Sequence, residues 1–225
     1  QKLDDISGYI FMKGSPSCGV FRVKVYRESG MPHELAGSGI YSKVIMEKFP
    51  LLPVEESGRL SDPVLKENFI NRVFAYREWQ SLNCDGLSIR KLIEFHSRYK
   101  YTLMAHSPNS CVELGRLLAN PEIAKLDEIA HEYITLFMGT LTLKATRKTN
   151  TNVLMHLQGY LKRNLDRKET ESLSEVIEQY RVGILPIIVP VSLMKVHFHS
   201  HPNSYIANQA FLKPYPEDLS LRNRI

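Results

Sequence analysis

The stretch WQSLNCDGLSIRK, residues 79–91, separates two parts of the chain that follow different patterns. Its centre, Asn83-Cys84-Asp85-Gly86, is a turn signal, because Asn, Asp and Gly tolerate the backbone conformations that turns require. Strand-like runs occur before this turn, and the sequence after it has helical periodicity. The turn therefore predicts a domain boundary between residues 1–86 and residues 87–225.

The first part is expected to be α/β. Two short runs rich in β-branched and aromatic residues, YIFMK at 9–13 and FRVKVY at 21–26, predict strands on either side of the loop KGSPSCGV, residues 13–20. A helix is predicted from about residue 37 to Phe49, followed by an extended segment bounded by prolines. Pro63 suits the first turn of a long helix, in which apolar residues recur at helical spacing.

The second part is predicted to be entirely helical. In LDEIAHEYITLFMGTLTLKATR an apolar stripe runs through Ile129, Tyr133, Phe137 and Leu141. Ser107 is expected to cap a helix that starts at Pro108, and Asp166 with Glu169 to form a capping box. The segment PIIVPVSLMKVHFHSH predicts either a kinked helix or one that starts late. The fold expected is thus a partial α/β domain followed by an all-α helical domain.

Composition and charge narrow the class of protein. Hydrophobic residues make up 43% of the 225, and no apolar stretch reaches the about 18 residues of a membrane span, so we expect a soluble protein without a membrane partner. No secretory signal opens the chain, and its three cysteines, at wide spacings, form a poor disulfide framework, which favours the cytoplasm. The net charge of the chain is +5, and all of this positive excess lies in residues 87–225. Such an excess favours a polyanionic partner.

Ordered blocks in both parts resemble known families. SPSCGV, RVKVY, GSGIY, FPLLPVEESGRLSDP and ENFINRVFAY resemble the C-terminal half of the thiouracil desulfurase (TudS-like) family. From FHSRYKYTLMAHSP to FLKPYPEDLSLRN the chain resembles the YbgA-like domain. This order of domains is similar to that of RudS-type desulfidases, which convert 4-thiouridine in tRNA to uridine.

The resemblance implies a cofactor. In these desulfidases three cysteines hold a four-iron-four-sulfur (4Fe-4S) cluster whose fourth iron takes sulfur from the substrate. Cys18 corresponds to the last of the three, and the other two are expected upstream of Gln1, so the fragment itself is expected to be inactive. From the local sequence alone, the alternative for Cys18 is a half-buried loop thiol without function.

Desulfuration by water needs a base, for which the sequence provides several candidates. Glu55 and Glu56 are carboxylates in a block that matches the family, and Ser15 and Ser17 flank the cysteine and can relay protons. The alternatives are a solvated pair of loop carboxylates and ordinary turn serines. The candidates for holding the negative charge of a cluster or phosphate are Lys13, Lys24, Arg59 and Arg72, with surface charge as the alternative.

The helical part is expected to bind tRNA through a basic face. Residues 87–168 hold 13 Lys and Arg against 7 Asp and Glu, and Tyr99, Tyr101 and Tyr160 are candidates for stacking on bases. The candidate phosphate ligands are Arg90, Lys91, Arg98, Lys100, Arg116, Lys144, Arg147, Lys148, Lys162 and Arg163. A solvated helix face is the alternative.

Structural hydrogen bonding is expected of His96, His106 and His156, with RNA contact as the alternative. The spacing of His197, His199 and His201 resembles that of metal ligands, but no cysteine or carboxylate is close in sequence. Cys84 and Cys111 are interpreted as incidental thiols.

Three functions remain open from the sequence. The first is an iron-sulfur-dependent desulfidase that acts on 4-thiouridine in tRNA. The second is a nucleic-acid-binding module without chemistry of its own. The third is a desulfurase of free thiopyrimidine bases, in which the helical part stabilises the protein or makes it dimerise.

Overall fold

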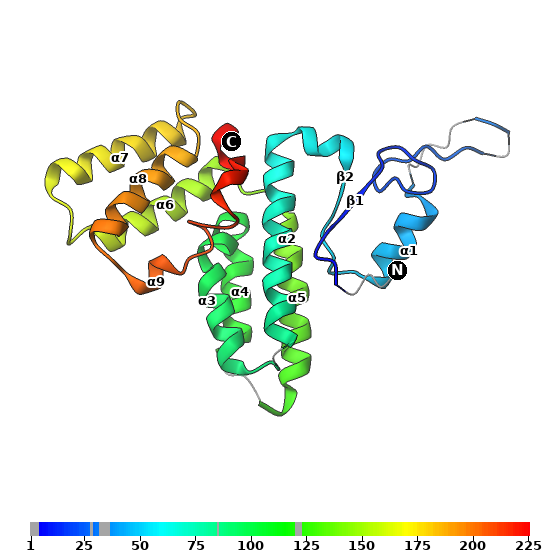
Figure 1. The fold of residues 1–225 in the computed structure, drawn as a ribbon, viewed down its shortest axis with the longest axis horizontal. Helices are drawn as coiled ribbons and strands as arrows, with labels where there is room; N and C mark the ends of the chain where they lie inside the picture. The colour runs from blue at the N-terminus through cyan, green and yellow to red at the C-terminus, as the bar shows by residue number, and fades with distance from the viewer. Residues whose placement is uncertain (1–4, 28, 32–36, 85, 120–122) are drawn as a thin grey trace. The chain divides into compact units, whose positions relative to one another are not determined.

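A computed structural model describes residues 5–27, 29–31, 37–84, 86–119 and 123–225 (Figure 1). The chain divides into two compact units, Gln1–Gln80 (unit 1) and Ser81–Ile225 (unit 2). The division falls inside helix α2, Pro63–Cys84. The described residues are mostly helical, with a small sheet near the N-terminus.

Unit 1 is built on two parallel strands. Strand β1, Tyr9–Phe11, pairs with β2, Val54–Glu56, with Tyr9 opposite Val54 and Phe11 opposite Glu56. Parallel strands need a crossover connection, and this one contains α1, Ile40–Lys48. Phe11, Val20, Ile45 and Leu52 form the buried core between them, and Cys18 packs against this core while remaining partly exposed. The expected α/β start and the helix ending near Phe49 are confirmed.

The strand predicted at residues 21–26 is wrong. In this segment Val23 forms an isolated antiparallel bridge with Gly37 and Tyr26 is a second isolated bridge residue, but the described residues form no continuous strand. Arg22 has a φ of 53°, in the left-handed region, which interrupts an extended backbone. The amide of Phe21 is moreover bonded to a glutamate side chain, so it is not available to a strand ladder. The partner of β1 instead comes from the extended segment that precedes the 3₁₀ helix Ser57–Ser61.

The long helix α2 begins where its sequence predicts. The Oδ1 atom of Asp62 accepts hydrogen bonds from the amides of Val64 and Leu65, at 2.8 and 3.1 Å. Pro63 occupies the first helical position, where its missing N–H leaves no donor unsatisfied. Phe69 is buried on this helix, in agreement with the predicted apolar stripe.

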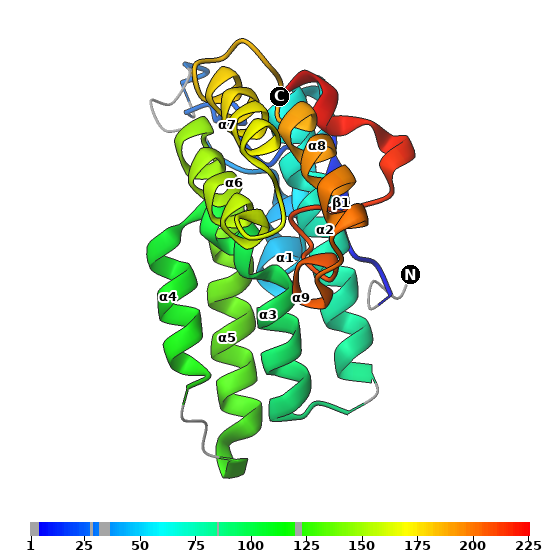
Figure 2. The same cartoon turned by 90° about the vertical axis from the view of Figure 1, so that its left-hand side faces the viewer.

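Unit 2 is a two-layer helical structure. Helices α3, α4 and α5 pack on one another, α6, α7 and α8 do the same, and α3 joins the two groups by packing on α6 (Figure 2). The bounds are Ile89–His106 for α3, Pro108–Leu117 for α4, Leu126–Thr142 for α5, Arg147–Leu161 for α6, Arg167–Arg181 for α7, Ile188–Ser200 for α8 and Ser204–Ala207 for α9. Short 3₁₀ helices occupy Ile123–Lys125, Glu217–Leu219 and Leu221–Arg224.

The helix ends of unit 2 follow the expected capping chemistry. Ser107 accepts a hydrogen bond from the amide of Ser110 at the start of α4, and Asp166 and Glu169 form a reciprocal capping box on α7. Helix α8 starts late rather than being kinked, because Pro190 lies in its first turn, where its missing N–H removes no helical bond. These three predictions are confirmed.

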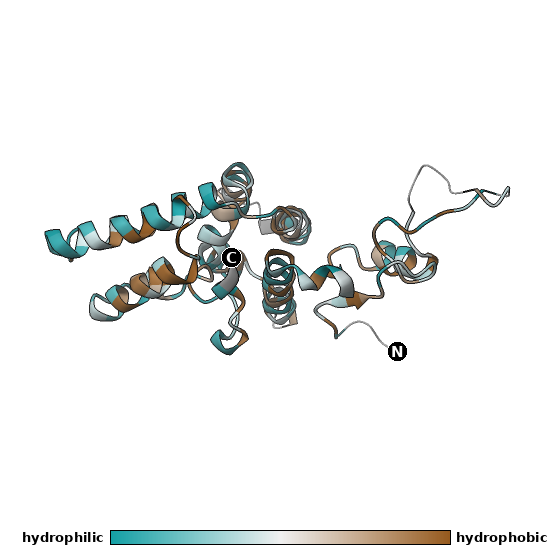
Figure 3. Cartoon of the chain, turned by 90° about the horizontal axis from the view of Figure 1, so that it is seen from above, coloured by the Kyte–Doolittle hydropathy of each residue, from teal (hydrophilic) through white to brown (hydrophobic). Residues whose placement is uncertain are grey.

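Burial also follows the predicted periodicity. Tyr133, Phe137 and Leu141, the stripe on α5, are each 0% exposed. Polar and apolar residues alternate along the helices in Figure 3, as expected of amphipathic helices that bury one face. Among the described residues, no helix combines the length and the apolar character that crossing a membrane requires.

Candidate active site and nucleic-acid interface

Cys18 lies on a tight turn that is closed by hydrogen bonds to Ser15. The amide of Gly19 donates to the carbonyl oxygen of Ser15 at 2.8 Å, and the amide of Cys18 donates to Ser15 Oγ at 3.2 Å. Ser17 Oγ lies 3.2 Å from Ser15 Oγ and 3.5 Å from Cys18 Sγ. The structure therefore brings three predicted site residues, Ser15, Ser17 and Cys18, into direct contact.

This turn is docked on the N-terminus of α1. No side chain caps that helix; instead the carbonyl oxygen of Ser17 accepts from the amides of Tyr41 and Ser42, at 2.9 and 3.3 Å. The carbonyl thus replaces a capping side chain for two helix amides that have no partner within the helix. A Cβ atom on Gly39 would lie 2.3 Å from the Ser17 carbonyl oxygen, so only glycine permits this approach.

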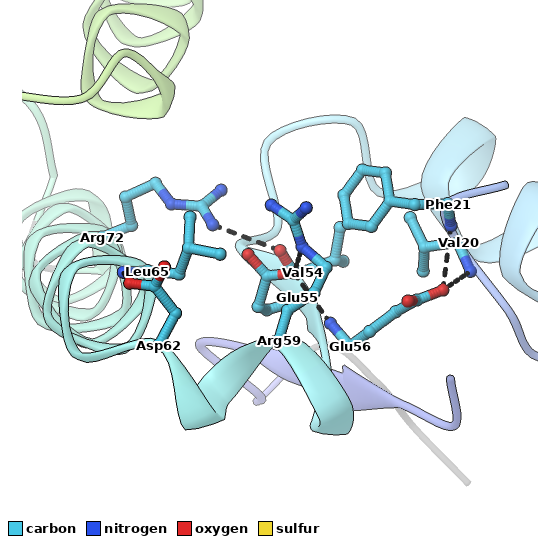
Figure 4. Close-up of polar contacts among 9 residues, drawn as sticks. All are labelled: Val20, Phe21, Val54, Glu55, Glu56, Arg59, Asp62, Leu65 and Arg72. Atoms are coloured by element: carbon cyan, nitrogen blue, oxygen red, sulfur yellow. Dashed lines mark hydrogen bonds and ion pairs between the residues drawn. The ribbon is translucent and has the colours of Figure 1, made fainter. Parts of the chain in front are cut away.

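Glu56 fixes the turn from its other side. Its Oε1 atom accepts from the amides of Val20 and Phe21, at 2.8 and 2.9 Å, and the residue is 2% exposed (Figure 4). Hydrogen bonds to an ionised carboxylate are stronger than neutral ones. Ser42 adds a further bond, because its buried hydroxyl donates to the carbonyl of Gly19 at 2.7 Å. The position of Cys18 is therefore set by neighbouring backbone groups on both sides.

Glu55 points away from this turn, because successive residues of a strand face opposite sides (Figure 4). Its Oε1 atom accepts from Arg59 Nε at 2.7 Å and from the amide of Glu56 at 2.9 Å. Arg72 donates to the carbonyl of Val54 at 3.2 Å. Burial lowers the pKa of Arg72, the Glu55 carboxylate opposes this, and the Arg59 guanidinium adds to it. The two adjacent glutamates thus bind different groups. Glu56 holds the turn that carries Cys18, whereas Glu55 binds Arg59 and does not contact Cys18.

The residues that sequence reasoning missed are Gly39 and Ser42. Both lie in the block GSGIYS, which the sequence analysis assigned to the start of the helix that ends near Phe49. The missed signal was the pairing of two glycine-containing turns, SCG and GSG, since close backbone approach requires glycine on at least one side.

The four-iron-four-sulfur cluster that the resemblance implies can be tested against these residues. Cys18 is partly exposed on a turn rich in backbone amides, which suits one thiolate ligand. Cys84 is exposed at the end of α2 and Cys111 is buried in α4, so neither joins Cys18 within unit 1. No cluster of three or more metal-binding side chains occurs in the part of the chain that the structure describes. These residues therefore provide one ligand and do not fit a complete three-cysteine site.

Four of the ten basic residues predicted to bind nucleic acid have partners within the protein. Arg90 Nε lies 2.8 Å from Glu94 Oε1, Lys91 Nζ donates to the carbonyl of Gly86, and Arg98 donates to the carbonyl of Asn208. Arg147 donates to the carbonyl of Tyr180 at 2.9 Å, with its guanidinium 5.1 Å from that ring. Arg147 therefore connects the start of α6 to the end of α7, a structural role that its sequence does not reveal.

The other six basic residues have no hydrogen-bond or ion-pair partner among the described residues. They are Lys100, Arg116, Lys144, Lys148, Lys162 and Arg163. Lys100 is half-buried and the other five are exposed. Unpaired cations at a surface are available to phosphates without first breaking an internal contact.

Two histidines of unit 2 have internal partners, as expected of structural residues. Nδ1 of His96 lies 3.2 Å from the hydroxyl of Tyr133, and Nδ1 of His106 lies 2.5 Å from the carbonyl oxygen of Leu143. Burial, with a further contribution from Lys100, lowers the pKa of His96 below its ordinary 6.5. His96 is therefore neutral at pH 7.

We predict that Glu56→Ala loosens the Cys18 turn. The amides of Val20 and Phe21 lose their acceptor, which costs about 1–3 kcal/mol for a buried donor left unsatisfied. Alkylation of Cys18 by iodoacetamide, followed by peptide mass spectrometry, should become faster. The matched control is Glu47→Ala, an exposed glutamate of α1, which should leave the rate unchanged. Equal rates in both variants would contradict the role given to Glu56.

A second prediction concerns pH. Because the folded state disfavours protonation of His96, its contribution to stability is complete above the unfolded pKa of 6.5 and decreases as the pH falls below it. The free energy of unfolding, measured in urea at pH 7.5 and pH 5, should therefore fall less in His96→Asn than in the parent. In the control variant His199→Asn, at an exposed position of α8, the free energy of unfolding should fall by as much as in the parent. If His96→Asn leaves the pH dependence of the free energy of unfolding unchanged, His96 is not the group responsible for it.

Comparison with known proteins places the helical unit in a family. The family described as protein of unknown function, DUF1722, matches residues 100–216. The "Uncharacterized protein YbgA" of Escherichia coli (strain K12) is 31% identical over 153 residues, which cover 68% of this chain and 90% of that protein. No solved structure gives a significant match. Since the family match spans more than half of the chain and the relative covers over two thirds of it, the chain belongs to the DUF1722 family.

Proposed function

We propose that this chain is part of a cytoplasmic, iron-sulfur-dependent desulfidase that converts 4-thiouridine in tRNA to uridine. In the net reaction, water replaces the thiocarbonyl sulfur with oxygen, and the sulfur leaves as hydrogen sulfide, so no oxidant or reductant is consumed. The observation that carries the proposal is the position of the Cys18 turn. The Ser17 carbonyl oxygen accepts from two amides at the start of α1, and the Glu56 carboxylate accepts from the amide of Val20. The TudS-like sequence blocks around it point the same way.

In the proposed enzyme, Cys18 is one of three thiolate ligands of a 4Fe-4S cluster, and the other two come from outside the described residues. When bound, such a cluster supplies an open iron that acts as a Lewis acid toward the thiocarbonyl sulfur. The chain's contribution is to hold the thiol in place before the substrate arrives. Because the turn is fixed at both ends, little conformational entropy is lost when Cys18 binds a partner.

The serines and glutamates receive separate roles in this proposal. Ser17, 3.5 Å from Cys18 Sγ and exposed, is placed to relay a proton beside the thiol. Ser15 and Glu56 position the turn through backbone amides. Glu55 is held by Arg59 and is 4% exposed, so a role as base would require the ion pair to open. Ser17 is therefore the better candidate for proton transfer among the described residues.

Unit 2 is proposed to bind the tRNA. The six basic residues whose side chains have no partner among the described residues supply charge for several phosphates. Binding is expected to weaken steeply as salt rises, because counterions are released from RNA. A second candidate function is a nucleic-acid-binding module without catalysis. It is favoured by the basic side chains of unit 2 that have no partner among the described residues, because phosphate binding by them needs no cluster.

The experiment uses the natural protein that contains this chain, purified without oxygen. We expect bound iron and acid-labile sulfide in the parent and in Cys84→Ala, and their loss in Cys18→Ala. The control is matched, because Cys84 is an exposed thiol outside unit 1. In cells, expression of the parent should lower the 4-thiouridine content of bulk tRNA, and Cys18→Ala should restore it.

The outcomes separate the candidates. A parent without iron, or an unchanged 4-thiouridine content, overturns the desulfidase. If such a protein still binds tRNA, the second candidate function replaces the first.

A further inference from the structure

Unit 2 contains an open groove that the sequence analysis did not predict. Its volume is about 950 Å³, near the upper end of the about 300–1,000 Å³ usual for ligand pockets. Helices α3, α4 and α6 line it with residues spaced along one helical face, and α9 contributes Tyr205; these helices are labelled in Figure 2. The face of α6 is the most regular, with Asn152, His156 and Tyr160 each one turn apart.

The described side chains that line the groove include a positive charge and no negative one. Lys100 lies in its lining, and no described residue that lines it is an aspartate or a glutamate. The carbonyl oxygen of Lys100 accepts from Cys111 Sγ, but the Lys100 side chain has no hydrogen-bond or ion-pair partner among the described residues. His96 and His156 add polar ring edges without negative charge. An anionic ligand is therefore favoured over a cation.

One wall of the groove is aromatic. Tyr160 is 42% exposed, and its ring centroid lies 6.0 Å from that of Tyr205 at an interplanar angle of 34°. The hydroxyl of Tyr101 donates to that of Tyr160 at 3.3 Å, which fixes the position of the exposed ring. Exposed tyrosine rings on a fixed support are the platforms on which unpaired bases stack in RNA-binding proteins.

A glycine keeps the groove open beside His96. A Cβ atom added to Gly115 of α4 would meet only His96 Nε2, at 3.6 Å, which is an ordinary contact. A larger side chain at this position would extend into the groove without a backbone clash, and alanine-like residues are better helix formers than glycine. Gly115 therefore offers a way to fill the groove while leaving every charge in place.

We propose that this groove binds an unstacked nucleotide of RNA, with the base against Tyr160 and Tyr205 and the phosphate at Lys100. The proposal rests on the proposed function and deepens it, because it names the part of unit 2 that holds a flipped or single-stranded nucleotide. Asn152 and His156 lie on the same wall as Tyr160 and supply hydrogen bonds to base edges. The aromatic wall and the lysine together select a nucleotide over a bare phosphate.

The test measures binding of tRNA to the whole chain by fluorescence anisotropy at fixed low salt. Gly115→Leu should weaken binding about tenfold, the loss expected when one base no longer stacks. Gly139→Leu is the matched control, because Gly139 is an exposed helical glycine of α5 whose Cβ would meet nothing within 4 Å. Tyr160→Ala should weaken binding similarly. Tyr160→Phe keeps the ring and loses only the hydrogen bond from Tyr101, so it should weaken binding less than Tyr160→Ala does.

A second readout locates the nucleotide directly. Ultraviolet crosslinking of the parent to tRNA, followed by peptide mass spectrometry, should place adducts on the peptides of Tyr160 or Tyr205. If the parent binds tRNA and both leucine variants bind equally well, the groove is not the nucleotide site, although tRNA binding by the proposed enzyme survives. Adducts confined to other peptides would likewise show that the groove is not the nucleotide site. If the parent fails to bind tRNA at low salt, the proposed function itself fails.

Discussion

The candidate site of unit 1 depends on one backbone contact, the acceptance of two α1 amides by the carbonyl oxygen of Ser17. Helix α1 has no side-chain cap, so the amides at its start need an acceptor from elsewhere in the chain. Meeting that need brings the residue before Cys18 to the helix end and leaves room only for glycine at position 39. Capping of the helix and placement of the thiol are thus the same interaction, and Glu56 secures the turn from the side of β2.

Unit 2 is held together by different physics. Its two groups of helices bury continuous apolar faces, with fully buried tyrosines, phenylalanines and leucines between them. Such faces leave the outer sides of α3, α4 and α6 free to carry polar and aromatic residues, and these line the open groove. The core and the groove thus share these helices, and His96 belongs to both, because it lines the groove and its Nδ1 contacts the hydroxyl of the buried Tyr133.

Much of the fold was predictable, because local chemistry decides it. Ser107 and Asp166 each cap a helix and Pro63 begins one, as their sequence context indicates, and Tyr133, Phe137 and Leu141 of the stripe on α5 are fully buried. The strand at 21–26 was not predictable, since its failure depends on Glu56, 35 residues away, which takes the amide of Phe21. The site was predicted in part: Ser15, Ser17 and Cys18 are neighbours in sequence, whereas the docking of Gly39 and Ser42 is a long-range contact. Arg147 shows the same limit, because only the tertiary structure reveals its contact with Tyr180.

The central claim is that one protein joins a sulfur-removing site to an RNA-binding unit. The most direct measurement compares sulfide release by the natural protein, kept free of oxygen, from 4-thiouridine in intact tRNA and from free 4-thiouracil at equal concentrations of the thio base. If unit 2 binds phosphates as proposed, sulfide release should be faster from tRNA, with an advantage that shrinks as salt rises. Faster release from the free base, or a preference for tRNA that salt does not change, would contradict the central claim.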